Sequence, residues 1–172
     1  MAHSVELLFD EATDAAIRVQ WAALAEAGLP SQARHRSPTN RPHVTLTVAE
    51  HLDPAVDEAL GALAARLPLP CRVGAPLVFG RTSAVVARLI VPSAGLLSVH
   101  AAVDEVCAPA TPSGPFPHAR PGQWTPHVTL ARRLVAADLA AALEVVAADD
   151  VVGAFAGLRR WDGDARVATV IA

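Results

Sequence analysis

The chain has 172 residues, of which 52% are hydrophobic, and its formal net charge is -3. This length suffices for one domain with a real core, and the hydrophobic fraction excludes an intrinsically disordered chain. The negative net charge argues against a protein that grips long duplex nucleic acid through a wide basic surface, whereas a small anionic ligand or the end of a strand stays compatible.

Membrane segments, metal centres and cofactor motifs have no signal in the sequence. No apolar run reaches the roughly 18 residues that span a bilayer, and the start of the chain lacks the basic and apolar stretches of a signal peptide. We therefore expect a cytoplasmic protein with no membrane contact and no cofactor. Cys71 and Cys107 lack metal-type spacing, so we predict that both are small buried hydrophobic residues.

The first half of the chain alternates strand-like and helix-like segments. Asp10 suits an N-cap position, and Gly28 and Pro30 end the helix that follows it. Asp53 and Pro54 open a second helix as its N-cap and first residue. The predicted elements are a strand at 4–9, a helix at 11–27, a polar loop at 30–41, a strand at 42–49, a helix at 54–67, and a hairpin of strands 71–79 and 84–91 around the turn 80–83.

The second half repeats this order. Ser93 suits the N-cap of the next helix, and helix starts in the two halves are offset by about 83 residues, as expected of an internal duplication. We expect one domain, 1–172, made of two repeats at about 1–91 and 92–172. The predicted elements here are a helix at 94–107, a loop at 108–125, a strand from 126, a helix around 139–146, and strands at 152–161 and 166–171 around the turn 162–164.

Two copies of one pentapeptide mark corresponding strands of the two halves. Pro-His-Val-Thr-Leu stands at 42–46 and again at 126–130. Because side chains alternate along a strand, His43 and Thr45 share one face, as do His127 and Thr129. The valine and leucine of each copy face the opposite way, into a core. Each copy therefore presents one imidazole and one hydroxyl side by side.

The duplication predicts an α+β fold with two lobes. Two similar halves can pack around a pseudo-two-fold axis, and this axis would bring the two pentapeptide strands face to face. We expect each lobe to contribute an antiparallel sheet that lines a central cleft, with the helices on the outside. The cleft would then hold two proton-transfer groups and two neutral hydrogen-bond donors.

The paired motifs resemble those of the 2H phosphoesterase superfamily, which includes the RNA 2',3'-cyclic phosphodiesterases also called 2'-5' RNA ligases. That family is defined by two His-x-Thr motifs on symmetric lobes, and this chain has them at 43–45 and 127–129. The family often has an arginine five residues beyond the second motif histidine, a place that Arg132 matches. The resemblance implies phosphodiester chemistry, with His43 and His127 as catalytic residues and Thr45, Thr129 and Arg132 as phosphate-binding residues.

These residue types suit phosphodiester chemistry on physical grounds as well. One imidazole can act as general base on the attacking water or hydroxyl while the other, protonated, donates to the leaving oxygen, and neither needs a metal. Threonine hydroxyls and an arginine can stabilise charge on the phosphate oxygens. The sequence leaves open which histidine is the base. Strict alternation places Arg133, not Arg132, on the face of His127, so Arg132 needs a bulge or the end of the strand to reach the cleft.

We expect a metal-independent phosphodiesterase that acts on 2',3'-cyclic phosphate ends of RNA or nucleotides, with reversible 2'-5' RNA ligation as an accompanying activity. The alternatives are an enzyme for another cyclic phosphate, such as ADP-ribose cyclic phosphate, or for 2'-5' oligoadenylate, and a non-catalytic nucleotide- or RNA-binding module. The expected partner is an RNA end or a cyclic nucleotide, and the expected state is a monomer.

Two further features have open interpretations. Trp124 precedes the second motif, and it is either a packing aromatic, which we favour, or a platform for a nucleobase. Arg34, Arg36 and Arg41 lie in the polar loop before the first motif, where they either draw in phosphates or form a solvated surface.

Overall fold

The structure, a computed structural model, describes residues 1–80 and 83–171 and has a mixed α+β architecture. Three short 3-10 turns complete the described elements: η1 (Gln32–Arg34), η2 (Ala108–Ala110) and η3 (Pro117–Ala119). The helices are α1 (Glu11–Glu26), α2 (Val56–Ala64), α3 (Ala94–Cys107) and α4 (Ala136–Val145). The strands are β1 (His3–Phe9), β2 (His43–Ala49), β3 (Leu69–Phe79), β4 (Ala84–Ile90), β5 (His127–Leu134), β6 (Val151–Asp162) and β7 (Val167–Val170).

All strands join one antiparallel sheet. Its order is β2-β1-β6-β3-β4-β5, and β7 pairs with β6. The α+β class and the antiparallel pairing are as predicted, but the expected two separate sheets are linked. The link is β6, which pairs with β3 through Val151–Phe155 and with β1 through its later residues. A long strand can serve both halves because it has an edge for each.

The strand order has a two-fold pattern. Exchanging β1 with β4, β2 with β5 and β3 with β6 turns the order of the sheet into its own reverse. The units related in this way are β1-α1-β2-α2-β3 and β4-α3-β5-α4-β6. In this division the second unit begins with β4. The sequence pattern instead predicted that the first repeat ends at about residue 91, after β4. The description as one domain of two repeats stays a prediction.

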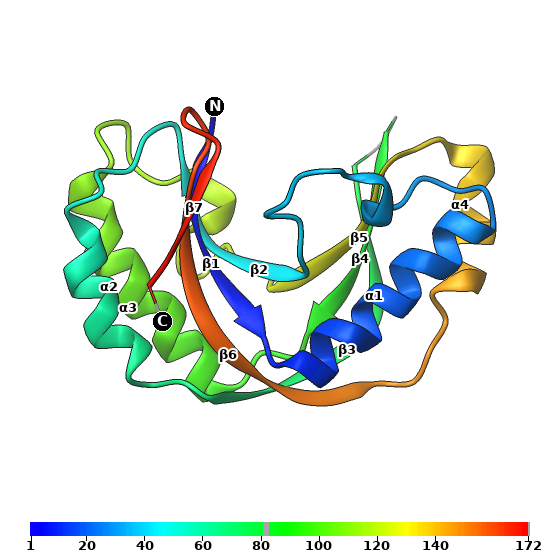
Figure 1. Ribbon diagram of the computed structural model, residues 1–172, viewed down its shortest axis with the longest axis horizontal. Helices are drawn as coiled ribbons and strands as arrows, with labels where there is room; N and C mark the ends of the chain where they lie inside the picture. Colours follow the sequence, from blue (N-terminus) through cyan, green and yellow to red (C-terminus); the bar gives the residue numbers. More distant parts are fainter. Residues whose placement is uncertain (81–82, 172) are drawn as a thin grey trace.

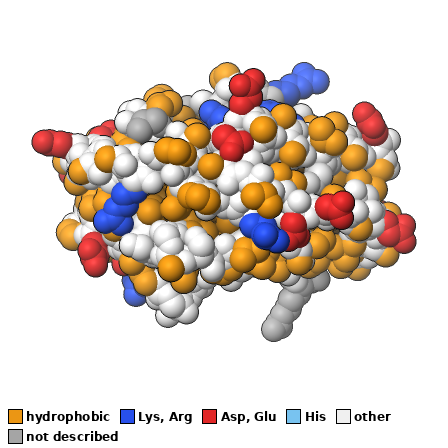
Figure 2. Space-filling view, turned by 90° about the horizontal axis from the view of Figure 1, so that it is seen from below, with side chains coloured by type: hydrophobic (Ala, Val, Ile, Leu, Met, Phe, Trp, Pro, Cys, Tyr) orange, Lys and Arg blue, Asp and Glu red, His pale blue; other side chains and the backbone are white. Residues whose placement is uncertain are grey.

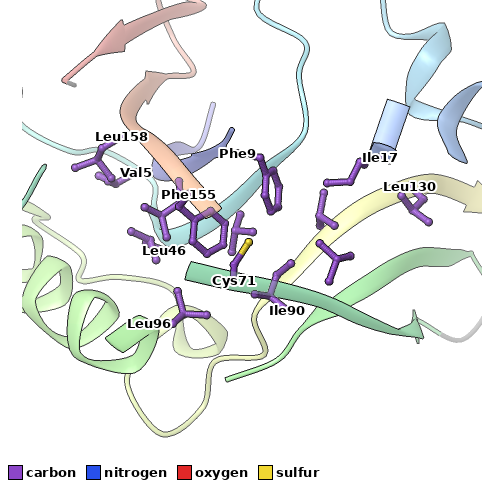
Figure 3. Packing of buried hydrophobic residues seen from close by; sticks show 14 of the residues in the cluster. Val5, Phe9, Ile17, Leu46, Cys71, Ile90, Leu96, Leu130, Phe155 and Leu158 are labelled. Carbon is purple, nitrogen blue, oxygen red and sulfur yellow. The ribbon is translucent and has the colours of Figure 1, made fainter. Parts of the chain in front are cut away.

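The helices lie on the outside of the curved sheet in two pairs (Figure 1). Helices α2 and α3 pack together beside β2, while α1 packs against α4 and β5. The buried apolar side chains form one cluster that spans both halves, with Phe9 against Phe155 near its middle at a ring-centroid distance of 5.0 Å. Figure 3 shows this continuity, from Val5 and Leu158 at one end to Leu130 at the other.

Most helix signals in the sequence are confirmed. The Asp10 carboxylate accepts a hydrogen bond from the Thr13 N–H at 2.7 Å, and the Ser93 hydroxyl accepts one from Leu96 N–H at 3.1 Å. The second helix starts later than predicted, because the Asp53 carboxylate accepts from the N–H of Ala55 and closes a turn before α2. Part of the predicted hairpin turn, 81–82, lies outside the described residues.

The remaining composition-based expectations concern burial. Cys71 and Cys107 are free and buried, as predicted, and burial raises the pKa of each thiol to about 12. Across the described ranges 1–80 and 83–171, no helix combines the length and the apolar character that crossing a membrane requires.

Candidate active site

The two motif strands are the two ends of the sheet. Strands β2 and β5 lie at opposite ends of the strand order, yet the curvature of the sheet brings them into contact at the centre of the molecule (Figure 1). The predicted alternation holds in both. The valine and leucine of each motif are at most 1% exposed, whereas His43 and His127 are partly exposed.

One cavity of about 570 Å³ receives both motifs. It contains every residue that the sequence singled out as catalytic or phosphate-binding: His43, Thr45, His127, Thr129 and Arg132. Their placement in one cavity is the geometry that the duplication predicted, while their roles stay a prediction. The other lining residues are Ala2, Ser4, Glu6, Val48, Phe79, Val85, His118, Gln123, Trp124, Thr125 and Trp161.

The two motif imidazoles are held in the same way. The Nδ1 atom of His43 lies 2.8 Å from the carbonyl oxygen of Arg41, and that of His127 lies 2.7 Å from the carbonyl oxygen of Thr125. A carbonyl oxygen only accepts, so each Nδ1 carries a hydrogen. The Nε2 atom of each ring is left for proton transfer, which is the arrangement that acid-base catalysis by histidine needs.

The motif threonines use their backbone for structure and leave their side chains free. The carbonyl oxygen of Thr45 accepts from the indole N–H of Trp124 at 2.9 Å, and that of Thr129 accepts from Trp21 at 3.1 Å. These bonds satisfy carbonyl groups on the outer edges of the sheet. Within the part of the chain that the structure describes, neither threonine hydroxyl has a hydrogen-bond partner, so both can donate to a bound phosphate.

Trp124 has a structural role, as favoured by the sequence. Besides its bond to Thr45, its ring stacks on His100 with a centroid distance of 3.9 Å and an interplanar angle of 7°. Burial lowers the pKa of His100, whose Nε2 lies 2.8 Å from the carbonyl oxygen of Ala119. One face of Trp124 is therefore covered by a buried imidazole.

His43 lies beside a buried ion pair. The Arg159 Nε atom is 2.7 Å from Oε2 of Glu6, and both side chains are 7% exposed. The other carboxylate oxygen of Glu6 is 3.7 Å from Nε2 of His43. Burial alone would raise the pKa of Glu6, but His43, Arg159 and Ser4 together lower it, so the carboxylate is ionised. The same ring also faces the guanidinium, because Nη2 of Arg159 lies 3.5 Å from Nδ1 of His43. Both members of the ion pair therefore border this imidazole.

His127 has an apolar and cationic environment instead. Its ring lies 4.7 Å from the ring of Phe79. Burial lowers the pKa of His127, and the positive charges of Arg132, His43 and His118 lower it further, against the opposing effect of the bond to Thr125. The imidazole at this position is therefore held in its neutral form near pH 7.

Arg132 reaches the cavity through a break in the strand. The β4–β5 register pairs Ala84 with Leu134 and Val86 with Ala131, so β5 has one more residue than β4 in this interval. Arg133 takes the extra position with a left-handed φ of 62°. A second shift, from the pair Val86–Ala131 to the pair Ala87–Thr129, gives β5 an extra residue before Arg132 as well. This earlier bulge reverses the alternation, so that Leu130 and Ala131 are both buried in the core and Arg132 lines the same cavity as His127.

Sequence reasoning missed four residues of the site. Glu6, Phe79 and Trp161 line the cavity, and Arg159 holds Glu6 in place. One signal was present for Glu6, because it is the single acidic residue of β1 and stands between the apolar residues Val5 and Leu7. Such a residue usually has a buried partner. No local signal named Arg159 as that partner.

A candidate metal-binding group lies elsewhere. Within residues 1–80 and 83–171, the group with suitable geometry is His3, His51 and Asp164, whose ligand atoms lie within 4.8 Å of one another. None of the three lines the cavity with the motifs. The metal independence of the reaction stays a prediction.

Comparison with protein families places this geometry in context. The family model described as the 2'-5' RNA ligase superfamily matches residues 13–162. The chain belongs to this superfamily. The resemblance to the 2H phosphoesterases that the paired motifs indicated is thereby confirmed.

Several solved structures have a similar fold. The protein TT0787 of Thermus thermophilus is 19% identical with a TM-score of 0.57, covering 100% of this chain and 96% of that one. LigT of E. coli, solved with 3'-AMP, is 15% identical with a TM-score of 0.50, covering 98% and 92%. Usb1 of Kluyveromyces marxianus is 14% identical with a TM-score of 0.50, covering 99% and 97%. No curated protein matches the sequence.

Proposed function

We propose that this protein is a metal-independent phosphodiesterase that opens 2',3'-cyclic phosphate ends of RNA or nucleotides. The observation that carries the proposal is the paired arrangement in one cavity. Among the described residues, the Nε2 atoms of the two imidazoles and the two threonine hydroxyls have no hydrogen-bond partner. Membership of the 2'-5' RNA ligase superfamily supports the same chemistry.

We assign the two imidazoles to different roles because their surroundings differ. His127 is the general base, because burial and positive neighbours favour its neutral form. Its Nε2 atom takes a proton from the attacking water as the water oxygen bonds to phosphorus. We assign His43 as the general acid, because a carboxylate oxygen of Glu6 lies 3.7 Å from its Nε2 atom. Its Nε2 proton passes to the ribose oxygen whose bond to phosphorus breaks.

The phosphate is held by the remaining residues that the motifs predicted. The hydroxyls of Thr45 and Thr129 donate to the nonbridging oxygens, and the Arg132 guanidinium neutralises their charge. Phe79 and Trp161 add aromatic surface to the same cavity, on which a nucleobase can stack. The same groups catalyse ligation when a 5'-hydroxyl replaces water as the attacking group, since the base accepts its proton in the same way.

A substrate screen tests the proposal. The protein is incubated with EDTA and uridine or adenosine 2',3'-cyclic phosphate, RNA with a terminal 2',3'-cyclic phosphate, ADP-ribose cyclic phosphate, or 2'-5'-linked adenylate. Products are separated by chromatography and identified by ³¹P NMR. The variant with both His43→Ala and His127→Ala, prepared identically, controls for contaminating nucleases.

We expect the nucleoside or RNA cyclic phosphates to be opened in EDTA, and the double variant to leave them intact. Turnover of ADP-ribose cyclic phosphate or 2'-5' adenylate alone would overturn the assigned substrate and keep the two-imidazole mechanism. Turnover that EDTA abolishes and one divalent ion restores would overturn the mechanism itself. Binding of nucleotides without turnover of any substrate would favour the non-catalytic alternative.

A further inference from the structure

A second cavity of about 730 Å³ adjoins the one that holds the motifs. The two share the lining residues Glu6, His43, Arg132 and Trp161, so a ligand can extend from one into the other. The far wall of the second cavity comes from η1 and the loop that leads into β2. Its other lining residues are Pro30, Ser31, Gln32, Arg34, His35, Thr39, Asn40, Arg133 and Arg159.

The second cavity is rich in cations although the chain is acidic overall. Four arginines line it, and its acidic lining residue, Glu6, is paired with Arg159. Arg34, Arg132 and Arg133 have no carboxylate partner among the residues that the structure describes. Arginines on the face seen in Figure 2 are scattered singly among apolar and acidic side chains. The arginines that line this cavity are therefore closer together than those on the face in Figure 2.

The loop that carries Arg34 is fixed before any ligand arrives. The Asn40 side-chain amide donates to the carbonyl oxygens of Gln32 and His35 at 2.9 and 3.0 Å. The Ser31 hydroxyl donates to the Trp21 carbonyl oxygen of α1. The Arg159 guanidinium, already bonded to Glu6, also donates to the carbonyl oxygen of Thr39 at 2.8 Å. A wall fixed in this way binds an anion without first losing conformational entropy.

We infer that this cavity, the Arg34 compartment, binds a second phosphate group of the substrate, one nucleotide away from the phosphate that reacts. Arg132 lines both cavities and lies between the two phosphates, while Arg34 and Arg133 contact the outer one. The inference rests on the proposed function and specifies its substrate: an oligonucleotide end is favoured over a free cyclic mononucleotide. Guanidinium groups suit this role because they bind phosphate oxygens with paired N–H donors.

Three substrates test the inference. These are uridine 2',3'-cyclic phosphate, the dinucleotide UpU ending in a 2',3'-cyclic phosphate, and the same dinucleotide with an uncharged methylphosphonate between its nucleosides. We expect kcat/KM for the charged dinucleotide to exceed that for the mononucleotide by about 10-fold or more, as one charged hydrogen-bonded contact allows. The uncharged dinucleotide should lose this advantage, and the gain should appear mainly in KM.

Variants of the loop assign the effect to Arg34. Arg34→Ala should lower kcat/KM for the charged dinucleotide by roughly 10-fold, and Arg34→Lys should restore part of it. Losing one phosphate contact should also make the salt dependence of kcat/KM less steep, because one charge pair that salt screens is removed. Arg36→Ala is the matched control: Arg36 is an exposed arginine in the same loop that does not line the cavity, and its removal should change neither kcat/KM nor the salt dependence.

The outcomes separate this inference from the proposed function. Equal kcat/KM for the charged and uncharged dinucleotides, or equal effects of Arg34→Ala and Arg36→Ala, would overturn the second phosphate site while turnover of the mononucleotide still upheld the function. Should no substrate be turned over, calorimetric binding of UpU ending in a 3'-phosphate replaces kcat/KM. The same comparison of charged with uncharged linkage then decides whether the compartment binds phosphate.

Discussion

The two halves of the molecule present the same motif in different surroundings. Both imidazoles are held through Nδ1 by the carbonyl oxygen two residues earlier, and both threonine carbonyls accept from an indole. The neighbours differ. Thr45 is paired in the sheet with Glu6, which pairs with Arg159, whereas Thr129 is paired with Ala87, which pairs with Leu77. A buried ion pair in one half thus corresponds to two aliphatic side chains in the other.

This difference shows how one duplicated motif can supply both an acid and a base. The backbone contacts that orient the imidazoles are symmetric, so the geometry of proton transfer is equivalent in the two halves. The neighbours of the two rings are not equivalent: the ion pair of Glu6 and Arg159 borders His43, while an aromatic ring and cations surround His127. The acid and base roles that we propose rest on this difference between the two halves.

Removing either imidazole should have the largest effect. We expect His43→Ala and His127→Ala each to lower kcat by roughly 10² to 10⁴, the range for a lost general acid or base. The double variant should be little worse than either single one, because groups that act as a unit are not additive. Single-turnover kinetics measures the rates, and thermal unfolding checks the fold. Full activity of either single variant would show that the halves do not act together.

The threonine hydroxyls should matter next. We expect Thr45→Val and Thr129→Val each to slow turnover by about 10² to 10³, because each removes one donor to the phosphate and keeps the branched side-chain shape. The indole bond to the backbone carbonyl remains in both variants, so melting temperatures should stay close to that of the unaltered protein. Wild-type rates in both variants would show that the threonine hydroxyls do not bind the phosphate and that these residues serve only to form the strands.

The ion pair of Glu6 and Arg159 can be replaced by the residue types at the corresponding positions of the other half, an alanine and a leucine. Glu6→Ala alone should destabilise the fold by about 3 to 5 kcal/mol, because it leaves the Arg159 charge buried without a partner. The double variant Glu6→Ala with Arg159→Leu copies Ala87 and Leu77 into the first half and should recover much of that loss. Denaturant unfolding measures both. The double variant should still turn over substrate slowly, because His43 has lost the carboxylate that lies 3.7 Å from its Nε2 atom.

The pH dependence of stability follows from the same pair. Because the pKa of Glu6 is lowered in the folded state, its contribution is fully present above the ordinary value of 4.5 and is lost as the pH falls through the lowered pKa. The double variant should lack this part of the acid sensitivity. Identical acid unfolding of the two proteins would contradict the assignment.

The smallest expected effect concerns the pH profile of kcat/KM. Because burial and neighbouring cations lower the pKa of His127, a base at this position stays neutral below the ordinary imidazole value, and the acidic limb should lie below about 6.5. His118→Ala removes one of those cations and should move the limb upward by less than about one pH unit. His51→Ala, which removes an exposed imidazole outside the cavity, should leave the limb in place. A limb that moves downward in His118→Ala would reverse the assignment of the base.

The sequence predicted the parts of this site that depend on local periodicity. The alternation of Val44 and Leu46 with the motif residues, and the pairing of the motifs across a cleft, follow from strand geometry and duplication. The Arg132 bulge could not be predicted, because it depends on the register that β5 adopts against β4. Glu6 and Arg159 meet only because β1 and β6, from opposite ends of the chain, are neighbours in the sheet. That adjacency is a property of the whole topology.

The indole bonds to the motif threonines also give the protein a built-in optical probe. The chain has three tryptophans and no tyrosine. Two of the tryptophans, Trp21 and Trp124, are bonded to the motif strands, and the third, Trp161, lines both cavities. All of the intrinsic indole emission therefore originates beside the cleft. Ligand binding in the cleft can therefore be followed by the intrinsic fluorescence of the unlabelled protein. Replacing each of the three tryptophans singly by phenylalanine would show which of them the ligand approaches.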